Sequence, residues 1–300
     1  MKSFILNILF LCTLSGYSQI ANYNQFPTMK PQHILDEKLD NISFSFSMRV
    51  VESNYEGPLI RLRRTSDNTT QDFGWADNDI VDVAAIDAWR GISEVYVVIW
   101  YDQSGLGRNA VQTILNKQPR FYTDNPLIPY FQGDGNDDYL TVDTPNGIQD
   151  VTTAGNQGTV IATMRATNRN QHSFGVLTGS DRWSTHTNWG NGNLYFDPGI
   201  CCNNIRFFDN RGGEAVWDIY TFVKTSTNVV ARSTLVERFN GIHTTGRCSR
   251  TEDFAICWAT GDGNSNYATT SFNELIMYNV DIAATQYQEI EENSKTFWGI

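Results

Sequence analysis

The sequence has few basic residues and, beyond its first residues, no long apolar run. Its 22 lysines and arginines stand against 33 aspartates and glutamates, which gives a formal net charge of −11. An acidic chain without a basic tract is poorly suited to nucleic acid or to an anionic membrane, so we expect neither partner. The one local basic group, Arg61, Arg63 and Arg64, alternates with apolar residues and predicts a solvated strand face.

The first residues are typical of an export signal. Lys2 precedes an apolar run, and Gly16 and Ser18 supply the small residues of a cleavage site. The run is too short for a membrane span, and we expect no other. The domain prediction is a signal peptide over 1–18, an N-terminal arm over 19–41 and one domain over 42–300. The mature protein should be secreted, periplasmic or on the cell surface.

Cysteine is scarce, with five residues, of which Cys12 would leave with the signal peptide. The other four are Cys201, Cys202, Cys248 and Cys257. An even number in an oxidising compartment makes disulfides plausible. A zinc site is less so, because adjacent cysteines cannot easily take two tetrahedral positions and no histidine is close in sequence. Four cysteines allow three connectivities, so a Cys248–Cys257 pair stays open, and we expect no cofactor or metal.

The residues that are plentiful indicate an all-β protein. Glycine (23 residues) and other turn formers separate short runs of β-branched and aromatic residues. Val95–Trp100 reads as a buried strand that ends in the polar loop Asp102-Gln103-Ser104-Gly105, and Ile42–Met48 alternates as a half-buried strand. Two helices are expected, over Asp79–Trp89 and over Ala283–Phe297, the second with Asp281 as its N-cap. We predict one domain in two sheets.

Several blocks resemble a known family. Tyr55–Asp67, Asp72, Val83–Trp89 and Tyr101–Gly107 follow the order and spacing of the opening of the arabinofuranosidase B catalytic domain. That resemblance implies a concanavalin-like jelly-roll sandwich of two antiparallel sheets and an α-L-arabinofuranosidase-type glycoside hydrolase. The second half, most clearly Phe272–Tyr278 with the final helix, is similar to laminin-G-like domains.

The family resemblance also implies site residues. Gly261-Asp262-Gly263-Asn264 resembles the loop that bears the acid/base aspartate, which assigns that role to Asp262; an ordinary hairpin turn is the alternative. The family's Leu-Glu-Asn-Gly-Leu nucleophile block is absent, and Glu214 is the best placed substitute. In the family, an adjacent cysteine pair forms a vicinal disulfide under the sugar; here Cys201-Cys202 could do so or pair elsewhere. The predicted catalytic residues are Asp262 and Glu214, and the predicted substrate-binding residues are Cys201, Cys202, Trp189, Asp102 and Asn264.

Two further groups leave alternatives open. Trp183, His186, Trp189 and Tyr195 could stack on sugar faces or belong to the core. Asp134, Asp137 and Asp138 could form an irregular calcium loop or an Asp/Gly turn, whereas an EF-hand is excluded by its missing Gly and Glu.

The sequence thus predicts an exported protein that hydrolyses terminal α-L-arabinofuranosyl residues of plant-type or other arabinose-containing polysaccharides. The alternative is a non-catalytic laminin-G-like module that binds glycan or protein. A purely structural surface protein is a third possibility.

Overall fold

The structure is a computed structural model that describes residues 33–300 except 168–170, 202–206, 211–214, 244–245 and 264. The predicted signal peptide and most of the predicted arm lie outside these residues. Within the described part of the chain, no helix has the length and apolar character needed to cross a membrane.

The regular structure of the described chain is mostly β-strand, with two α-helices and two short 3₁₀ turns, Leu115–Lys117 and Gly147–Asp150. The helices are α1 (Val83–Arg90) and α2 (Ala284–Trp298). The strands are β1 (Ile42–Ser47), β2 (Ile60–Arg64), β3 (Thr70–Phe73), β4 (Val95–Trp100), β5 (Ala110–Val111), β6 (Arg120–Tyr122), β7 (Tyr130–Gln132), β8 (Leu140–Val142), β9 (Gly158–Arg165), β10 (Phe174–Thr178), β11 (Asp181–His186), β12 (Asn193–Ile200), β13 (Phe207–Asn210), β14 (Asp218–Lys224), β15 (Asn228–Ser233), β16 (Val236–Ile242), β17 (Phe254–Ile256) and β18 (Ser271–Tyr278).

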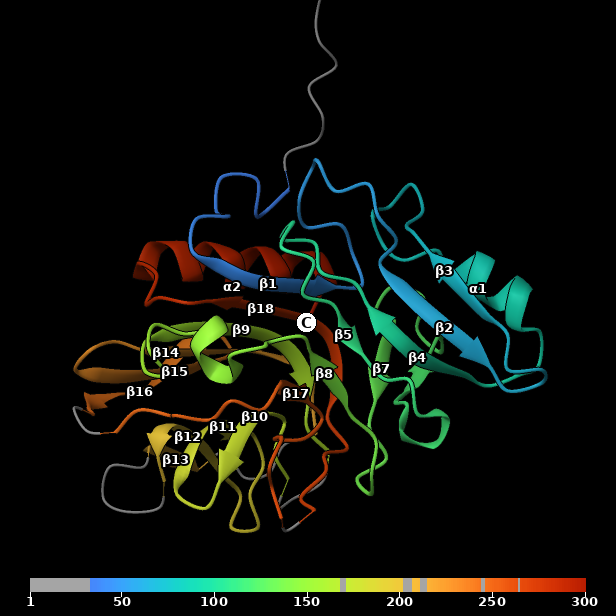
Figure 1. The fold of residues 1–300 in the computed structure, drawn as a ribbon. Coiled ribbons are helices and arrows are strands. Elements are labelled where there is room, and N and C mark those ends of the chain that lie inside the picture. The colour runs from blue at the N-terminus through green and yellow to red at the C-terminus, as the bar shows by residue number, and fades with distance from the viewer. Residues whose placement is uncertain (1–32, 168–170, 202–206, 211–214, 244–245, 264) are drawn as a thin grey trace, which may run out of the picture. The chain divides into compact units, whose positions relative to one another are not determined.

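Antiparallel pairing arranges the strands in two layers (Figure 1). One layer has the order β16-β15-β14-β9-β18-β1. The other runs β13-β12-β11-β10-β17-β8-β5-β4-β2-β3. The short strands β6 and β7 join the layers, because β6 pairs with β4 and β7 pairs with β18. The all-β sandwich predicted from the sequence is confirmed.

Aromatic rings fill the space between the layers. Phe46 of β1 stacks on Trp100 of β4 with ring centroids 5.2 Å apart, and Phe222 of β14 meets Phe196 of β12 at 5.1 Å. All four side chains are fully buried. Since burying one such side chain contributes about 1.5–3 kcal/mol, these contacts are a main source of cohesion between the layers.

A second hydrophobic cluster lies under α2, on the outer face of the first layer. Ile161, Ile219 and Ile276 from the strands pack with Tyr287 and Ile290 of the helix. The first layer is therefore covered on both faces, and β14 and β18 are buried along their whole length.

The segment before β1, which the sequence assigns to an arm, packs on the domain from residue 33 onward. Leu35 is fully buried in the cluster under α2, and its N–H donates to the Val51 carbonyl over 2.9 Å. The Tyr278 hydroxyl also donates to the Lys38 carbonyl. These contacts fix residues 33–41 to the first layer.

The prediction that β1 is half-buried is wrong, since all six of its residues are buried. The alternating apolar and polar residues of β1 face two different environments, and both lie inside the protein. Phe44 and Phe46 face the aromatic core, whereas the Ser43 hydroxyl donates to the Val151 carbonyl and the Ser47 hydroxyl donates to Glu274. Buried hydroxyls need such partners, because an unpaired one costs about 1–3 kcal/mol.

A buried ion pair ties the segment after β1 to β18 and to α2. The Arg49 Nε donates to Glu274 Oε2 over 2.8 Å, and the two side chains are 4% and 1% exposed. Arg49 also donates to Asn293 at 2.8 Å and to the Ser294 hydroxyl at 3.1 Å. Side chains from β18 and α2 thus supply the hydrogen-bond partners of the Arg49 guanidinium.

The start of each helix differs from the prediction. Helix α1 begins later than predicted, and α2 has a different N-cap residue. The predicted start of α1 at Asp79 is wrong: Asp79 has a φ of 63°, Ile80 bridges to Arg49, and the helix starts at Val83 with Asp82 as its N-cap. Asp281 is not the cap of α2. The capping position is Ala283, which makes no side-chain bond, and Asp281 accepts from Gln157 instead.

Candidate functional site

The loop after β4, predicted to present a site, holds the free edge of β1. Asp102 is 5% exposed. Its Oδ1 accepts the N–H groups of Ser45 and Ser104 at 2.9 Å, and its Oδ2 accepts from the Ser104 hydroxyl and the Arg108 N–H. Gln103 continues the pairing, because its N–H donates to the Ser45 carbonyl. Through these contacts Asp102 stabilises its own loop and attaches it to β1. Its role in substrate binding stays a prediction.

Asp262 lies in a buried polar cluster at one end of β10 and β11. Its carboxylate is 1% exposed, and Oδ2 lies 3.9 Å from Nε2 of His172, whose side chain is 2% exposed. The His172 ring packs on the His186 ring with centroids 3.9 Å apart, and His186 packs on Trp189 at 4.2 Å. Trp189 is partly exposed, so the cluster runs from a buried carboxylate to a ring at the surface.

The backbone around Asp262 explains why the cluster forms. The Asp262 Oδ2 accepts the Asn266 N–H over 3.0 Å, and the Asn266 carbonyl accepts the His172 N–H over 3.0 Å. The loop after β17 is thereby held against the start of β10. The His186 Nδ1 lies 2.8 Å from the Gln171 carbonyl, which fixes its ring beside His172. Sequence reasoning missed His172, because no motif or metal-type spacing marks it.

Of the four predicted aromatic candidates, two reach the surface. Trp183 is fully buried and packs edge-on against Phe196 at 5.0 Å, so it belongs to the core. His186 is 1% exposed, whereas Trp189 and Tyr195 are partly exposed near the β11–β12 turn. Trp189 and Tyr195 are therefore the two rings of this group that a ligand can reach.

Cys201 lies at the other end of the β11–β12 hairpin. Its N–H donates to the Ser180 carbonyl, whereas His186 pairs with Tyr195. His186 lies six positions after Ser180 along the strand, which corresponds to about 20 Å at roughly 3.3 Å per residue. The structure thus places Trp189 and Asp262 in one cluster and Cys201 away from Trp189.

The cysteines settle one alternative. Cys248 and Cys257 are free, fully buried thiols, so the predicted alternative of a bond between them is wrong. Cys201 is disulfide-bonded. Cys202 lies outside the described residues, as do Glu214 and Asn264, so the vicinal bond and the roles of these three residues stay predictions.

We expect almost no reactive thiols in the native protein after removal of residues 1–18. When this protein is denatured without a reducing agent, two thiols should become reactive. Burial raises the pKa of both Cys248 and Cys257, which removes the reactive thiolate from the folded state. Thiol titration before and after denaturation measures both numbers. Peptide mapping should find Cys201 and Cys202 joined within one fragment, and four reactive thiols would contradict the vicinal bond.

Two other carboxylates lie in the sequence between the cysteine pair and Asp262, and the structure gives both clear positions. Asp218, on β14, is 4% exposed, and its Oδ1 accepts the Thr234 N–H over 2.7 Å. Glu237, on β16, is exposed. Both belong to the first layer, whereas Asp262 is held against β10 in the second.

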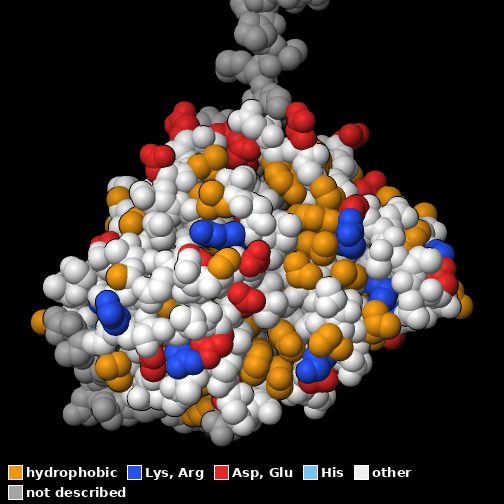
Figure 2. Space-filling view, in the orientation of Figure 1, with side chains coloured by type: hydrophobic (Ala, Val, Ile, Leu, Met, Phe, Trp, Pro, Cys, Tyr) orange, Lys and Arg blue, Asp and Glu red, His pale blue; other side chains and the backbone are white. Residues whose placement is uncertain are grey.

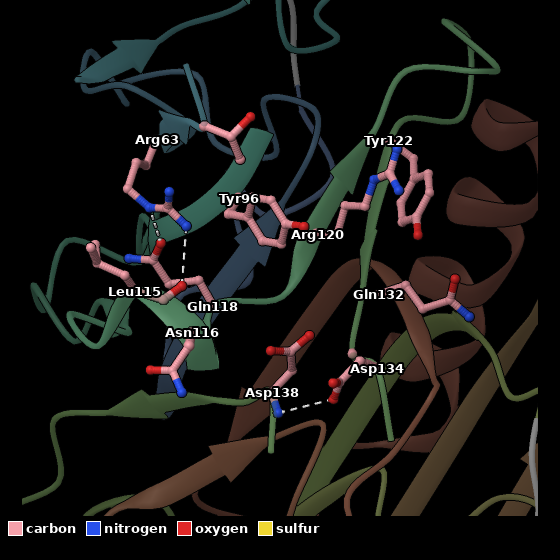
Figure 3. Close-up of a pocket in the computed structure, with 12 residues that line it drawn as sticks. Arg63, Tyr96, Leu115, Asn116, Gln118, Arg120, Tyr122, Gln132, Asp134 and Asp138 are labelled. Atoms are coloured by element: carbon pink, nitrogen blue, oxygen red, sulfur yellow. Dashed lines mark hydrogen bonds between the residues drawn. The ribbon is translucent and has the colours of Figure 1, made fainter. Parts of the chain in front are cut away.

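A separate pocket of about 480 Å³ lies near β2, β4, β6 and β7 (Figure 3). Arg63, Tyr96, Arg120, Tyr122 and Asp138 are among the residues that line it. Arg63 corrects the prediction of a solvated strand face, because it is 6% exposed and its Nε donates to Gln118 over 2.6 Å. Arg61 follows the prediction and pairs with Asp72 in a partly exposed ion pair.

The surface carries no extended basic area on the face shown in Figure 2, where Lys and Arg side chains lie apart from one another. Arg120 of β6 is paired with Glu94 over 2.7 Å.

Solved structures with a similar fold include arabinofuranosidases. A mutant GH54 α-L-arabinofuranosidase soaked with 4-nitrophenyl α-L-arabinofuranoside has a TM-score of 0.67 at 16% identity. An arabinofuranosidase complexed with arabinofuranosyl-α-1,2-xylobiose has a TM-score of 0.64 at 15% identity, and a GH54 enzyme soaked with a cyclic sulfate inhibitor has 0.61 at 17%. No protein-family model matches the sequence, and no curated protein is significantly similar to it.

These comparisons show a shared β-sandwich fold. The match covers 88% of this chain but only 64% of each arabinofuranosidase chain. The fold is therefore a β-sandwich similar to that of these arabinofuranosidases. At this identity the likeness extends to the fold alone.

Proposed function

We propose that this protein is an exported carbohydrate-active enzyme that hydrolyses terminal α-L-arabinofuranosyl residues of plant-type or other arabinose-containing polysaccharides. The observation that carries the proposal is the cluster in which Asp262, assigned as acid/base by resemblance, lies beside His172 and within two ring contacts of the partly exposed Trp189. Export follows from the predicted signal peptide, with cleavage near Ser18.

In the proposed reaction, Asp262 protonates the leaving glycosidic oxygen and later activates water, as the acid/base of a retaining glycosidase does. Trp189 offers a flat apolar surface on which a sugar ring can stack. Glu214 is the proposed nucleophile, which would have to lie about 5–5.5 Å from Asp262 for retention.

The test is release of 4-nitrophenol from 4-nitrophenyl α-L-arabinofuranoside by the full chain. We expect turnover with this substrate and little with the matching β-D-xylopyranoside, because the two differ in ring size. A wild-type protein that releases no 4-nitrophenol from either substrate would contradict the proposal.

A second candidate function is a non-catalytic module that binds glycan. The burial of Asp262 favours it, because a side chain that is 1% exposed and accepts a backbone N–H also fits a turn-stabilising role. Affinity electrophoresis in arabinoxylan or arabinan distinguishes the two: retarded migration without turnover, unchanged by loss of the Asp262 carboxylate, would identify a binding module.

A further inference from the structure

Three partly exposed aromatic rings contact one another and form what we call the aromatic platform: Tyr139, Trp258 and Tyr267. The Trp258 and Tyr267 rings stack with centroids 4.9 Å apart and an interplanar angle of 19°. Tyr139 contacts Trp258 at 5.1 Å and Tyr267 at 6.1 Å. Tyr139 precedes β8 and the other two follow β17, so two paired strands bring the rings together. A contiguous apolar area that stays open to solvent is typical of an interaction site.

The backbone fixes the rings of the aromatic platform in place. The Ala268 N–H donates to the Cys257 carbonyl over 2.7 Å, which closes the loop that carries the two stacked rings. Cys257 has a φ of 66°, a left-handed conformation that is uncommon outside glycine, and it turns the chain just before Trp258. The Tyr139 N–H donates to the Lys117 carbonyl over 3.1 Å, which holds the third ring. A ligand therefore meets rings that are already positioned, and little ordering opposes its binding.

The aromatic platform begins at the rim of the 480 Å³ pocket. Asp138 lines this pocket and directly precedes Tyr139. Gly133 lines it too, and a Cβ atom placed on this glycine would lie 2.3 Å from the Ala268 carbonyl oxygen. The loop that carries the two stacked rings therefore packs directly against the wall of the pocket. The rings and the pocket thus form one continuous site.

The other end of the aromatic platform lies at the loop of Asp262. Tyr267 follows Asn266, whose N–H donates to the Asp262 Oδ2 over 3.0 Å. The Asp262 N–H donates in turn to the carbonyl of Ala259, the residue after Trp258, over 3.1 Å. Burial is the main reason that the pKa of Tyr267 is raised, and the charge of Asp262 contributes to the rise. The same short loop therefore carries both the carboxylate and two of the rings.

The lining of the pocket combines polar groups of both charges (Figure 3). Arg63 and Arg120 contribute donors, whereas Asp138 contributes acceptors. Some of these groups are fixed before a ligand arrives, because Arg63 is 6% exposed and donates to Gln118 over 2.6 Å. Gln118 donates to the Gln112 carbonyl over 2.9 Å. A hydroxyl group both donates and accepts, so this lining suits a neutral ligand rich in hydroxyl groups better than an ion of one sign.

We propose that the aromatic platform and this pocket together bind the main chain of a neutral polysaccharide, a linear chain of pentose units that continues to the loop of Asp262. A sugar ring has a flat face of C–H groups that can stack on the aromatic rings, and its hydroxyls can bond the polar groups of the pocket. Only the placement of a terminal arabinofuranosyl residue at Asp262 rests on the proposed function. Binding of the main chain requires no hydrolysis.

The test is isothermal titration of the full chain with two probes, linear xylohexaose and linear arabinohexaose. The second probe ends in an arabinofuranosyl residue, so its titration uses Asp262→Asn to prevent cleavage. We expect saturable binding of at least one probe, and the better one identifies the main chain. Trp258→Ala and Tyr139→Ala should each weaken binding at least about tenfold, which corresponds to 1.4 kcal/mol. The matched control is Trp75→Ala, at a tryptophan that is 36% exposed, which should bind as the parent protein does.

A ring-preserving variant separates stacking from loss of fold. Tyr267→Phe keeps the flat ring and should bind within about twofold of the parent protein, whereas Tyr267→Ala should bind much more weakly. The Tm of each variant shows whether it has folded, and the three rings come from two separate segments, so one unfolded variant leaves the others to decide. Absence of binding of both probes would overturn the proposal, as would unchanged affinity in folded Trp258→Ala and Tyr139→Ala. Binding that depends on the rings, in a protein that releases no 4-nitrophenol, would support this site and contradict the proposed hydrolysis.

Discussion

Glu274→Ala is expected to lower the free energy of unfolding by about 3–5 kcal/mol, because it leaves the charge of Arg49 buried without its carboxylate partner. Arg49 is 3% exposed and cannot turn to water without breaking its bonds to Asn293 and Ser294 of α2. The Ser47 hydroxyl would also lose its acceptor. Denaturant unfolding followed by circular dichroism measures the change.

The matched control is Glu289→Ala, in α2. Glu289 pairs with Lys38 over 3.4 Å, but its side chain is 62% exposed. Its loss should cost less than about 1 kcal/mol, as is usual for a surface ion pair. Replacing Arg49 and Glu274 together by Met and Leu should recover part of the loss. Equal costs for Glu274→Ala and Glu289→Ala would show that burial does not set the strength of this pair.

Asp262→Asn is expected to lower kcat for the chromogenic arabinofuranoside by about 10²–10⁴-fold, since an amide cannot donate the proton that the leaving oxygen needs. The amide oxygen can still accept the Asn266 N–H, so the loop should keep its shape and the Tm should change little. Initial rates at saturating substrate give the ratio. The result bears on the proposed acid/base role directly.

The control for this variant is Asp143→Asn, the same change at an exposed position that makes no contact with the cluster. It should keep the wild-type kcat. If Asp262→Asn retains its rate while wild-type turnover is real, the proton donor is another residue and Asp262 has the turn-stabilising role.

Much of the fold could be predicted from local patterns. The strand Val95–Trp100 was predicted with the bounds that it has, because a run of β-branched and aromatic residues without Gly or Pro has few alternatives. Local sequence patterns gave wrong predictions where a segment contacts elements that are distant in the sequence. Ser47 of β1 is buried against Glu274 of β18, which lies 227 residues later in the sequence. Ile80 departs from the helical pattern because it forms a bridge with Arg49.

The candidate site was harder to predict from the sequence, because contacts between distant parts of the chain determine it as well. The tetrapeptide Gly-Asp-Gly-Asn occurs twice, at 133–136 and at 261–264. In the first, Asp134 is exposed and caps its own loop, whereas in the second Asp262 is buried beside His172. Identical local sequences therefore have different surroundings, which are fixed by residues about a hundred positions away. Sequence alone could nominate Asp262 but not its histidine neighbours.

The junction of Arg49 with Glu274 and Ser294 has a consequence for how the chain reaches its native state. The first strand of the domain cannot complete its ladder until β18 and α2 exist, so a nascent chain on the ribosome lacks its closing partners until Ser294 has been made. Such long-range closure slows folding. For the proposed export, this means that the chain would remain unfolded, and so able to pass through a translocation channel, until its synthesis is almost complete.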